Sequence, residues 1–414
     1  MKRRAIAILG LGLTISLAGW AAKPAGSPAP CAIRAAKILT VTRGVVTDGT
    51  VLVRGGKIER VLGSTVVPPG YRIIDATSLW LLPGFVDAHS HSGGEGWGDV
   101  NESILQINPD LRTLDVIALN TFQLRRAVAG GVTAINFVPG SMSNNGGLGI
   151  AMKTAGDDLD AVVLRFPSVL KIAQAGNPER PFSGELGAGR MGMAWQLRML
   201  MRKLRACHDA AKDPRSVQSS SGTAPQAGLE DALGIFDGAL PVFVHSAEVQ
   251  PVQEAIRLYL QEFGIPRVVI THGEFGAYRN GPVLASTAVR YDCGPRLYDF
   301  EEDSFRGIAT EYEKAGVEGI SLNTDSYDDA PERLPLQAAM AVRLGLGEDK
   351  ALEGITINPA RTLGLDRRIG SIEEGKDADL VVWSGNPLDV RSHVVLVLID
   401  GKIVYDTAKE EQRY

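Results

Sequence analysis

The chain has 414 residues, of which 44% are hydrophobic and 22% charged, and its formal net charge is −5. This length is enough for one large or two moderate domains with a well-buried core. The mildly acidic balance argues against nucleic acid as a partner. Its three cysteines, Cys31, Cys207 and Cys293, are too few and too scattered for a disulfide framework.

The N-terminus predicts a targeting segment. Lys2, Arg3 and Arg4 precede an apolar stretch that ends in small residues, which is the pattern of a secretory signal peptide over residues 1–22. The apolar part is shorter than the about 20 residues of a membrane span, although a retained anchor is the alternative. We therefore expect an exported protein, periplasmic or extracellular, with no membrane span after cleavage.

Both ends of the mature chain read as short β-strands. Three dipeptides predict hairpin turns between alternating apolar runs: Asp48-Gly49, Gly55-Gly56 and Asp400-Gly401. Neither end alone has enough strands for a core. We expect residues 31–82 and 366–414 to form one small β-domain together.

Residues 83–365 alternate strand-like and helix-like patterns. Repeated strand, helix, strand units of this total size predict a parallel α/β fold, and the length suits a (β/α)8 TIM barrel. A doubly wound open sheet is the alternative. That alternative is weakened because no glycine-rich phosphate loop opens a helix after the first strand.

The stretch "LLPGFVDAHSHSGG" at residues 81–94 ends a strand-like run with two histidines one residue apart. Side chains at positions i and i+2 of a strand point to the same face. His89 and His91 can therefore present two imidazoles to one divalent metal ion, if other segments supply further ligands.

Three more residues of ligand type stand at the ends of strand-like runs: His245, His272 and Asp325. In a parallel barrel the carboxyl ends of all strands open on one face, where active sites are built. The sequence therefore predicts that these residues converge with the His89/His91 pair. Of the six histidines, His208 reads as an exposed helical residue and His393 as part of the β-domain.

Four motifs together resemble the amidohydrolase superfamily of metal-dependent hydrolases: "PGFVDAHSH", "VFVHS", "VITHGE" and "LNTDS". The C-terminal "ITINPARTLGLDRRIGSIEEGKDADLVVW" resembles its imidazolonepropionase-like and exported dipeptidase-like branch. The resemblance covers nearly the whole chain after the signal segment. It implies a TIM barrel with a β-sandwich built from both chain termini.

The resemblance also implies a ligand set. His89, His91 and Asp325 would hold one metal, and His245 and His272 would hold a second metal or a substrate oxygen. Lys171, in "PSVLKIAQAGNPERP", stands where family members with two metals carry a bridging carboxylated lysine. We expect zinc, two ions per chain, because zinc favours N and O donors. Family members are commonly homo-oligomers, and the pattern itself counts no subunits.

The expected reaction is hydrolysis of a C–N bond in a small-molecule amide or dipeptide. Asp325 would act as base and then acid, with His272 or His245 near the scissile carbonyl. Arg180 and Arg190 are candidates for binding a substrate carboxylate.

Glu248, in "HSAE", keeps an alternative open. It resembles the His-x-x-Glu of deaminases that use one metal, for which the substrate would be a cyclic amidine or heterocycle. Glu248 can equally be a carboxylate at a helix N-terminus. A catalytically silent binding protein of the same fold is the third interpretation. Metal content distinguishes the three.

Overall fold

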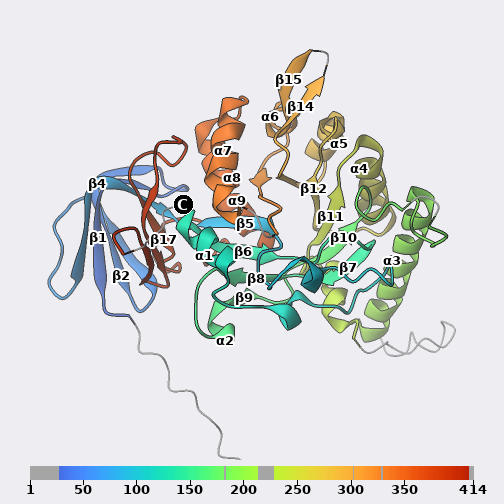
Figure 1. Ribbon diagram of the computed structural model, residues 1–414, viewed down its shortest axis with the longest axis horizontal. Coiled ribbons are helices and arrows are strands. Elements are labelled where there is room, and N and C mark those ends of the chain that lie inside the picture. The colour runs from blue at the N-terminus through green and yellow to red at the C-terminus, as the bar shows by residue number, and fades with distance from the viewer. Residues whose placement is uncertain (1–27, 181–182, 213–227, 302, 328–329, 410–414) are drawn as a thin grey trace, which may run out of the picture.

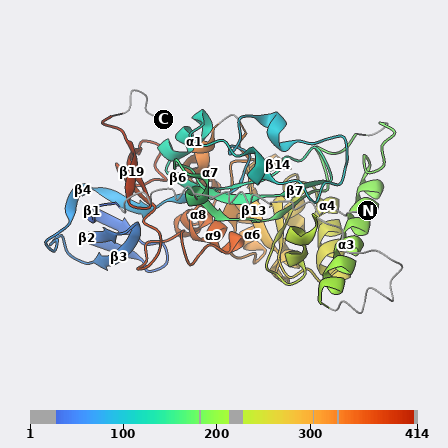
Figure 2. The same ribbon diagram turned by 90° about the horizontal axis from the view of Figure 1, so that it is seen from below.

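The computed structural model describes residues 28–180, 183–212, 228–301, 303–327 and 330–409 (Figure 1). The predicted signal peptide lies outside these residues. Within the described ranges, no helix is long and apolar enough to cross a membrane. The molecule is a mixed α/β protein, with a β-sheet at one side and a larger unit of strands and helices beside it (Figures 1 and 2).

Strands from both ends of the chain share one seven-stranded sheet, in the order β19-β18-β17-β4-β1-β2-β3. β4 is central, because it pairs in parallel with β1 and antiparallel with β17. The bounds are β1 Cys31–Leu39, β2 Val45–Arg54, β3 Lys57–Leu62, β4 Arg72–Pro83, β17 Leu380–Trp383, β18 Val394–Ile399 and β19 Lys402–Asp406. The two chain ends thus combine as expected, while the second layer of a sandwich and the domain boundaries stay predictions.

Two of the three predicted turns are confirmed. Gly55-Gly56 joins β2 to β3 and Asp400-Gly401 joins β18 to β19, each dipeptide with positive φ at both residues. The third was wrong, because Asp48-Gly49 lies inside β2, and the chain turns earlier, at 40–44. Asp48 has φ 50°, so the dipeptide is a local irregularity of the strand and not its end.

The central unit contains two further sheets. One has the order β16-β13-β12-β11-β10-β7, and the other β5-β6-β8-β9. Neighbours from β10 to β16 run parallel, as do β5 and β6. The bounds are β5 Phe85–Ser90, β6 Val132–Phe137, β7 Asn145–Leu148, β8 Ile150–Lys153, β9 Val163–Arg165, β10 Leu170–Ala173, β11 Val242–Ser246, β12 Val268–His272, β13 Arg290–Cys293 and β16 Ser321–Leu322.

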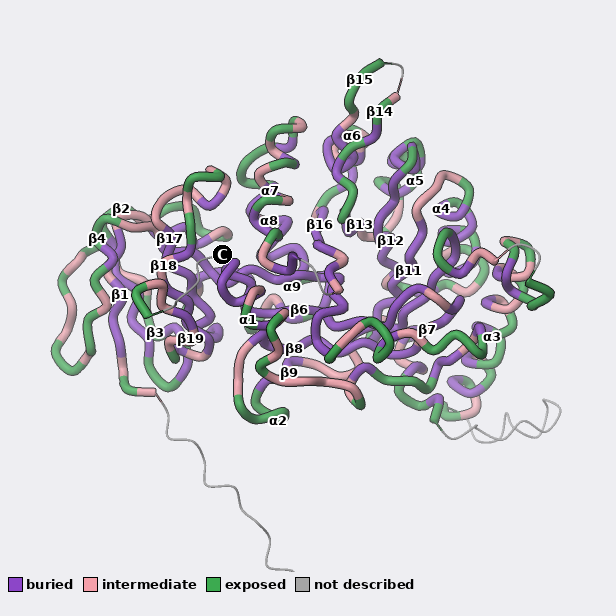
Figure 3. Tube along the Cα trace, viewed as in Figure 1, coloured by how far each residue is buried: buried purple, intermediate pink, exposed green. Residues whose placement is uncertain are grey.

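These strands are buried along their lengths, and helices pack outside them (Figure 3). Continuous apolar runs such as that of β11 are typical of strands covered on both faces. The helices are α1 Phe122–Ala129, α2 Leu159–Val162, α3 Arg190–Lys212, α4 Val249–Ala255, α5 Gly281–Ala285, α6 Ile308–Lys314, α7 Leu334–Arg343, α8 Glu348–Gly354 and α9 Ile357–Leu363. A hairpin of β14 Tyr298–Glu301 and β15 Ser304–Gly307 projects from this unit (Figure 1).

The first and last parallel strands of the central unit meet just beyond their carboxyl ends. The amide of Asp325 donates to the carbonyl of His89 at 3.1 Å, and the amide of His91 donates to the carbonyl of Ser326 at 2.7 Å. These bonds join the segments that follow β5 and β16. Residues more than 230 positions apart in the chain therefore lie side by side.

A buried ion cluster ties the terminal sheet to the central unit. Lys153, at the end of β8, lies with its Nζ 3.0 Å from Asp377, 3.1 Å from Asp379 and 2.5 Å from Asp400. Asp377 and Asp379 precede β17, and Asp400 lies in the turn between β18 and β19. The cluster fixes the C-terminal strands against β8.

Candidate metal centre

The structure brings together the five residues that were expected at strand ends. His89 belongs to β5 and His91 follows it; His245 is in β11, His272 ends β12, and Asp325 follows β16. Asp325 Oδ1 lies 3.4 Å from His89 Nε2 and 3.2 Å from His91 Nε2. The ring centroid of His272 is 5.0 Å from that of His89 and 4.2 Å from that of His245.

Three of the four imidazoles are held by hydrogen bonds on their Nδ1 atoms, whereas His89 Nδ1 is buried without a partner among the described residues. His91 Nδ1 lies 2.8 Å from the carbonyl of Val138, and His272 Nδ1 lies 2.6 Å from that of Gly294. A carbonyl can only accept, so both rings carry the proton on Nδ1 and leave Nε2 with a free lone pair. His245 Nδ1 lies 3.1 Å from Ser141 Oγ. Such outer partners orient metal-binding imidazoles.

Lys171 enters this group from β10. Its side chain is fully buried, and Nζ lies 2.7 Å from His89 Nε2. Among the described residues no carboxylate comes within ion-pairing distance of Nζ. Burial lowers the pKa of Lys171 to about 7. An amine that has no carboxylate at ion-pairing distance is thus inserted among imidazoles.

The electrostatic environment of the group favours neutral imidazoles and an ionised aspartate. Burial lowers the pKa of each of the four histidines. Burial acts to raise the pKa of Asp325, but the neighbouring His272, His91 and Lys171 outweigh it and hold the pKa below its ordinary range. Neutral imidazoles and a carboxylate are the protonation states that bind a metal.

The donor set fits a divalent cation. One ligand atom each from His89, His272 and Asp325 lie within 4.8 Å of one another. His272 Nε2 is buried and has no hydrogen-bond partner among the described residues. A buried polar atom without a partner costs about 1–3 kcal/mol, which a bound cation would offset. Nitrogen and oxygen donors of this kind suit zinc and similar ions.

Asp87 is a residue of the site that the sequence did not single out. It is fully buried in β5, where its Oδ2 accepts a hydrogen bond of 2.5 Å from Thr324 Oγ1 and its Oδ1 one of 3.2 Å from the amide of His89. Burial raises its pKa to about 7. The signal was available, because Asp87, His89 and His91 alternate on one strand face. Asp87 ties the segments before His89 and Asp325 together.

The two candidate arginines lie in the loop after β10 and at the start of α3. Arg190 donates from Nε to Glu179 and from Nη2 to Glu248, both at 2.9 Å. Arg180 donates to the carbonyl of Met142 at 2.9 Å and lies 3.7 Å from Glu185. Glu248 is the residue before α4, at the helix N-terminus. Both arginines are therefore already engaged with groups of this chain.

His208 and Cys293 lie in structural environments that differ from those predicted from the sequence. His208 is buried on α3, not exposed, because its ring is 5.3 Å from that of Phe236 and its Nε2 lies 3.1 Å from Asp237. The stretch "YDCGPR" around Cys293 reads as a loop in the sequence, but Cys293 is the last residue of β13 and is buried. Neither belongs to the metal centre.

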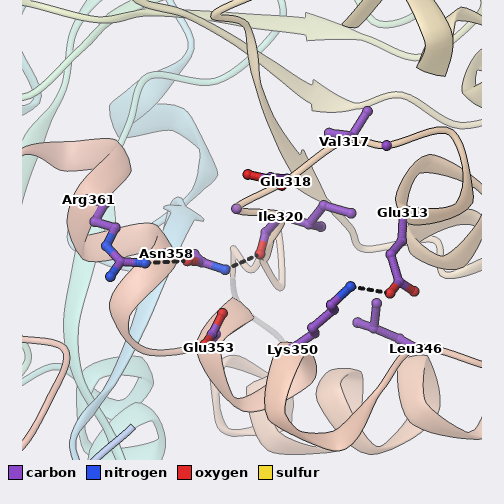
Figure 4. Close-up of a pocket in the computed structure, with 11 residues that line it drawn as sticks. Glu313, Val317, Glu318, Ile320, Leu346, Lys350, Glu353, Asn358 and Arg361 are labelled. Atoms are coloured by element: carbon purple, nitrogen blue, oxygen red, sulfur yellow. Dashed lines mark hydrogen bonds and ion pairs between the residues drawn. The ribbon is translucent and has the colours of Figure 1, made fainter. Parts of the chain in front are cut away.

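A cavity of about 370 Å³ lies elsewhere, along the segment that precedes β16. It is lined by Val317–Ile320 and by charged side chains that pair with each other or with amides, such as Lys350 with Glu313 and Arg361 with Asn358 (Figure 4). Asp325 follows the other end of β16. The cavity thus lies away from the imidazoles and contains none of them.

Comparisons with known proteins identify the family of the chain. A model of the amidohydrolase family matches residues 302–404. The crystal structure of an amidohydrolase from Thermotoga maritima MSB8 is 35% identical, with a TM-score of 0.81, and the match covers 91% of this chain and all of that one.

Two curated relatives match most of this chain. Amidohydrolase tasK of Hapsidospora irregularis is 29% identical over 86% of this chain, which spans only 40% of that protein. A dihydroorotase of Anaeromyxobacter sp. (strain K) is 25% identical, over 92% of this chain and 99% of that protein. With the Thermotoga match covering the full length of that structure, the chain belongs to the amidohydrolase family.

Proposed function

We propose that this protein is a metal-dependent hydrolase that cleaves the C–N bond of a small amide or dipeptide. The observation that carries the proposal is the gathering of His89, His272 and Asp325, with Lys171 buried against His89. His91 and His245 complete the group. Family membership supports hydrolysis as the reaction class.

The fold that would present this site is a (β/α)8 barrel. Support comes from the parallel ladder β10 to β16, from the β5–β6 pair and from the bonds between the segments after β5 and β16. In such a barrel the carboxyl ends of the strands face one mouth, so that ligands from distant segments meet there.

The proposed ligands are His89, His91 and Asp325 for one ion, and His245 with His272 for a second. Lys171 would bridge them as a carbamate: its amine nitrogen bonds to the carbon of carbon dioxide and releases a proton. This converts an unpaired buried amine into an anionic oxygen donor, which zinc accepts. The position of Nζ beside His89 supports the assignment.

When bound, the metal supplies Lewis acidity, which polarises a carbonyl and makes water acidic enough to ionise near pH 7. Asp325 would accept the proton of the attacking water and deliver it to the leaving nitrogen. His272 and His245 would hold the second ion, which would polarise the scissile carbonyl. The buried imidazoles and Asp87 keep these groups in place and exclude bulk water.

The deaminase alternative requires Glu248 as a proton shuttle. Here its side chain pairs with Arg190 and is 47% exposed. This setting favours the role of a carboxylate at a helix N-terminus. We therefore retain amide hydrolysis as the proposal.

The test combines metal analysis with product analysis on the full chain. We expect two zinc ions per chain, release of new amino groups from a panel of dipeptides and N-acyl amino acids, and loss of turnover after chelation. One ion per chain with release of ammonia from cyclic amidines would replace the proposal by a deaminase. A protein that binds no metal and turns over nothing would be a silent member of the fold.

We also propose that the protein is exported, with residues 1–22 as a signal peptide. The support is the basic, apolar and small-residue order of that segment. Sequencing the N-terminus of protein secreted from an expression host would test it. A mature chain that begins at Met1 would refute cleavage.

A further inference from the structure

Three aromatic rings form a stack that runs outward from the metal centre. The ring of Tyr327 lies on that of His91, with centroids 4.0 Å apart and an angle of 15° between planes. The ring of Trp97 lies 3.7 Å from that of Tyr327, tilted by 57°. His91 is itself a candidate ligand, and its Nε2 is 3.2 Å from Asp325 Oδ1. Only the ring of Tyr327 therefore lies between Trp97 and the candidate ligands.

Solvent exposure rises along this stack. The side chain of His91 is 1% exposed, that of Tyr327 is half-buried, and Trp97 is 39% exposed. Trp97 lies in a 3₁₀ helix that follows β5, and Tyr327 lies two residues after Asp325. Both therefore belong to segments that follow the carboxyl ends of strands, the end at which the imidazoles gather.

The stack is rigid enough to bind a ligand. The hydroxyl of Ser92 donates to the carbonyl of Tyr327 at 2.9 Å, which anchors that segment to the one that follows β5. Asn101 Nδ2 donates to the carbonyl of Trp97 at 3.0 Å, which closes the turn that carries the indole. Aromatic rings held in this way offer large contact area at small entropic cost.

The part of the site beside His245 is ionic. Glu179 and Glu248, which follow β10 and β11, hold Arg190 between them. The backbone of Gly176, in the same loop, lies close enough that a Cβ built there would be 3.7 Å from His245 Nε2. A charged or polar end of a substrate would find ionic partners on this side.

We propose that Trp97 and Tyr327 form a platform that binds a planar aromatic group of the substrate, beside the His91 end of the site. The preferred substrates are then amides or dipeptides with an aromatic side chain next to the scissile bond. This inference rests on the proposed function and adds to it a preference for aromatic substrates. Offset and edge-to-face ring contacts strengthen binding beyond the burial of apolar area, so loss of one ring should weaken it measurably.

The experiment compares paired dipeptides that differ only in having Phe or Ala beside the scissile bond, on the zinc-replete full chain. We expect kcat/KM to be higher for the Phe member. Trp97→Ala should lower kcat/KM for the Phe substrate about tenfold, mainly through KM. Zinc content and kcat/KM for the Ala substrate should not change. Trp195→Ala is the matched control, because Trp195 is also exposed, at 52%, but lies on α3.

Equal loss for both substrates, or a preference for Ala in the parent, would overturn the platform while leaving hydrolysis intact. If no dipeptide is turned over, the proposed function fails, and calorimetry with phenylalanine amide judges the platform alone. Binding that weakens in Trp97→Ala but not in Trp195→Ala supports it, and absence of binding to the parent overturns it. Trp97→Phe, which retains a ring, should restore most of the preference if folding is sound.

Discussion

Two buried lysines in this chain have opposite surroundings. Lys153 lies among Asp377, Asp379 and Asp400, and these acids outweigh the effect of burial and raise its pKa to about 12. Lys171 is equally buried, but it faces His89, and burial lowers its pKa to about 7. The chain thus pairs the ammonium of Lys153 directly with carboxylates where it fastens two sheets together, and leaves Lys171 without a directly paired carboxylate.

A group that is buried without a partner is costly, so it persists where function requires it. Lys153 is therefore a structural lysine, and Lys171 is the lysine that we propose to be functional. Removing Lys153 should therefore mainly lower stability, and removing Lys171 should mainly lower activity.

The largest expected effect is loss of activity in Lys171→Met. Removing a metal ligand should lower kcat/KM by more than about 100-fold, since even the outer partners of ligands are worth about 10- to 100-fold. Zinc content should fall, and the free energy of unfolding of the metal-free protein should not decrease. Chemical denaturation and metal analysis measure both. Retained activity and metal would remove Lys171 from the centre.

Lys153→Met should show the reverse. It leaves Asp379 buried without its cation, while Asp377 keeps its pairs with Lys57 and Arg368. Breaking a buried ion pair from one side costs about 3–5 kcal/mol. We expect this loss in the free energy of unfolding from denaturant titration, with zinc per folded chain unchanged. It is also the matched control for Lys171→Met. A stable Lys153→Met protein that lacks metal would invalidate the comparison.

Asp379 makes stability depend on pH. Burial raises its pKa from 3.8 to about 6, so the folded state favours the protonated form. Its stabilising contribution is complete below about pH 4 and is lost as pH rises through about 6, a change of up to about 3 kcal/mol. Asp379→Asn, which keeps an acceptor for Lys153, should flatten this part of the curve of unfolding free energy against pH. An unchanged curve would contradict the assignment.

The smallest expected effect is that of Arg190→Met. Its ion pairs with Glu179 and Glu248 are partly exposed, and such pairs contribute about 0–1 kcal/mol. Stability should therefore hardly change. If Arg190 also binds a substrate carboxylate, KM should rise for substrates with an acidic end but not for their amides. Equal KM values in the variant and the parent would exclude that role.

Much of the site followed from the sequence because its signals are local. His89 and His91 alternate on one strand, and His245, His272 and Asp325 each stand where an apolar run stops. The terminal strands and the Asp400-Gly401 turn were predicted from alternation and turn chemistry. The turn at Asp48-Gly49 was wrongly predicted, because this dipeptide lies inside β2, where backbone pairing with β1 and β3 keeps the chain extended.

Other features depend on long-range contacts. The burial of His208 arises from Phe236 and Asp237, which helical spacing on α3 does not reveal. Trp97 and Tyr327 are 230 positions apart, and nothing in either local pattern indicates a shared stack. The engagement of Arg190 by two glutamates likewise comes from three separate segments.

The amino-acid sequence alone determined which side chains are available to bind a metal and at which strand ends they stand, because strand alternation and apolar runs are properties of adjacent residues. Only the tertiary structure decided which buried charges are compensated. Compensation depends on where distant segments bring their carboxylates: Lys153 obtained three of them, and Lys171 obtained an imidazole.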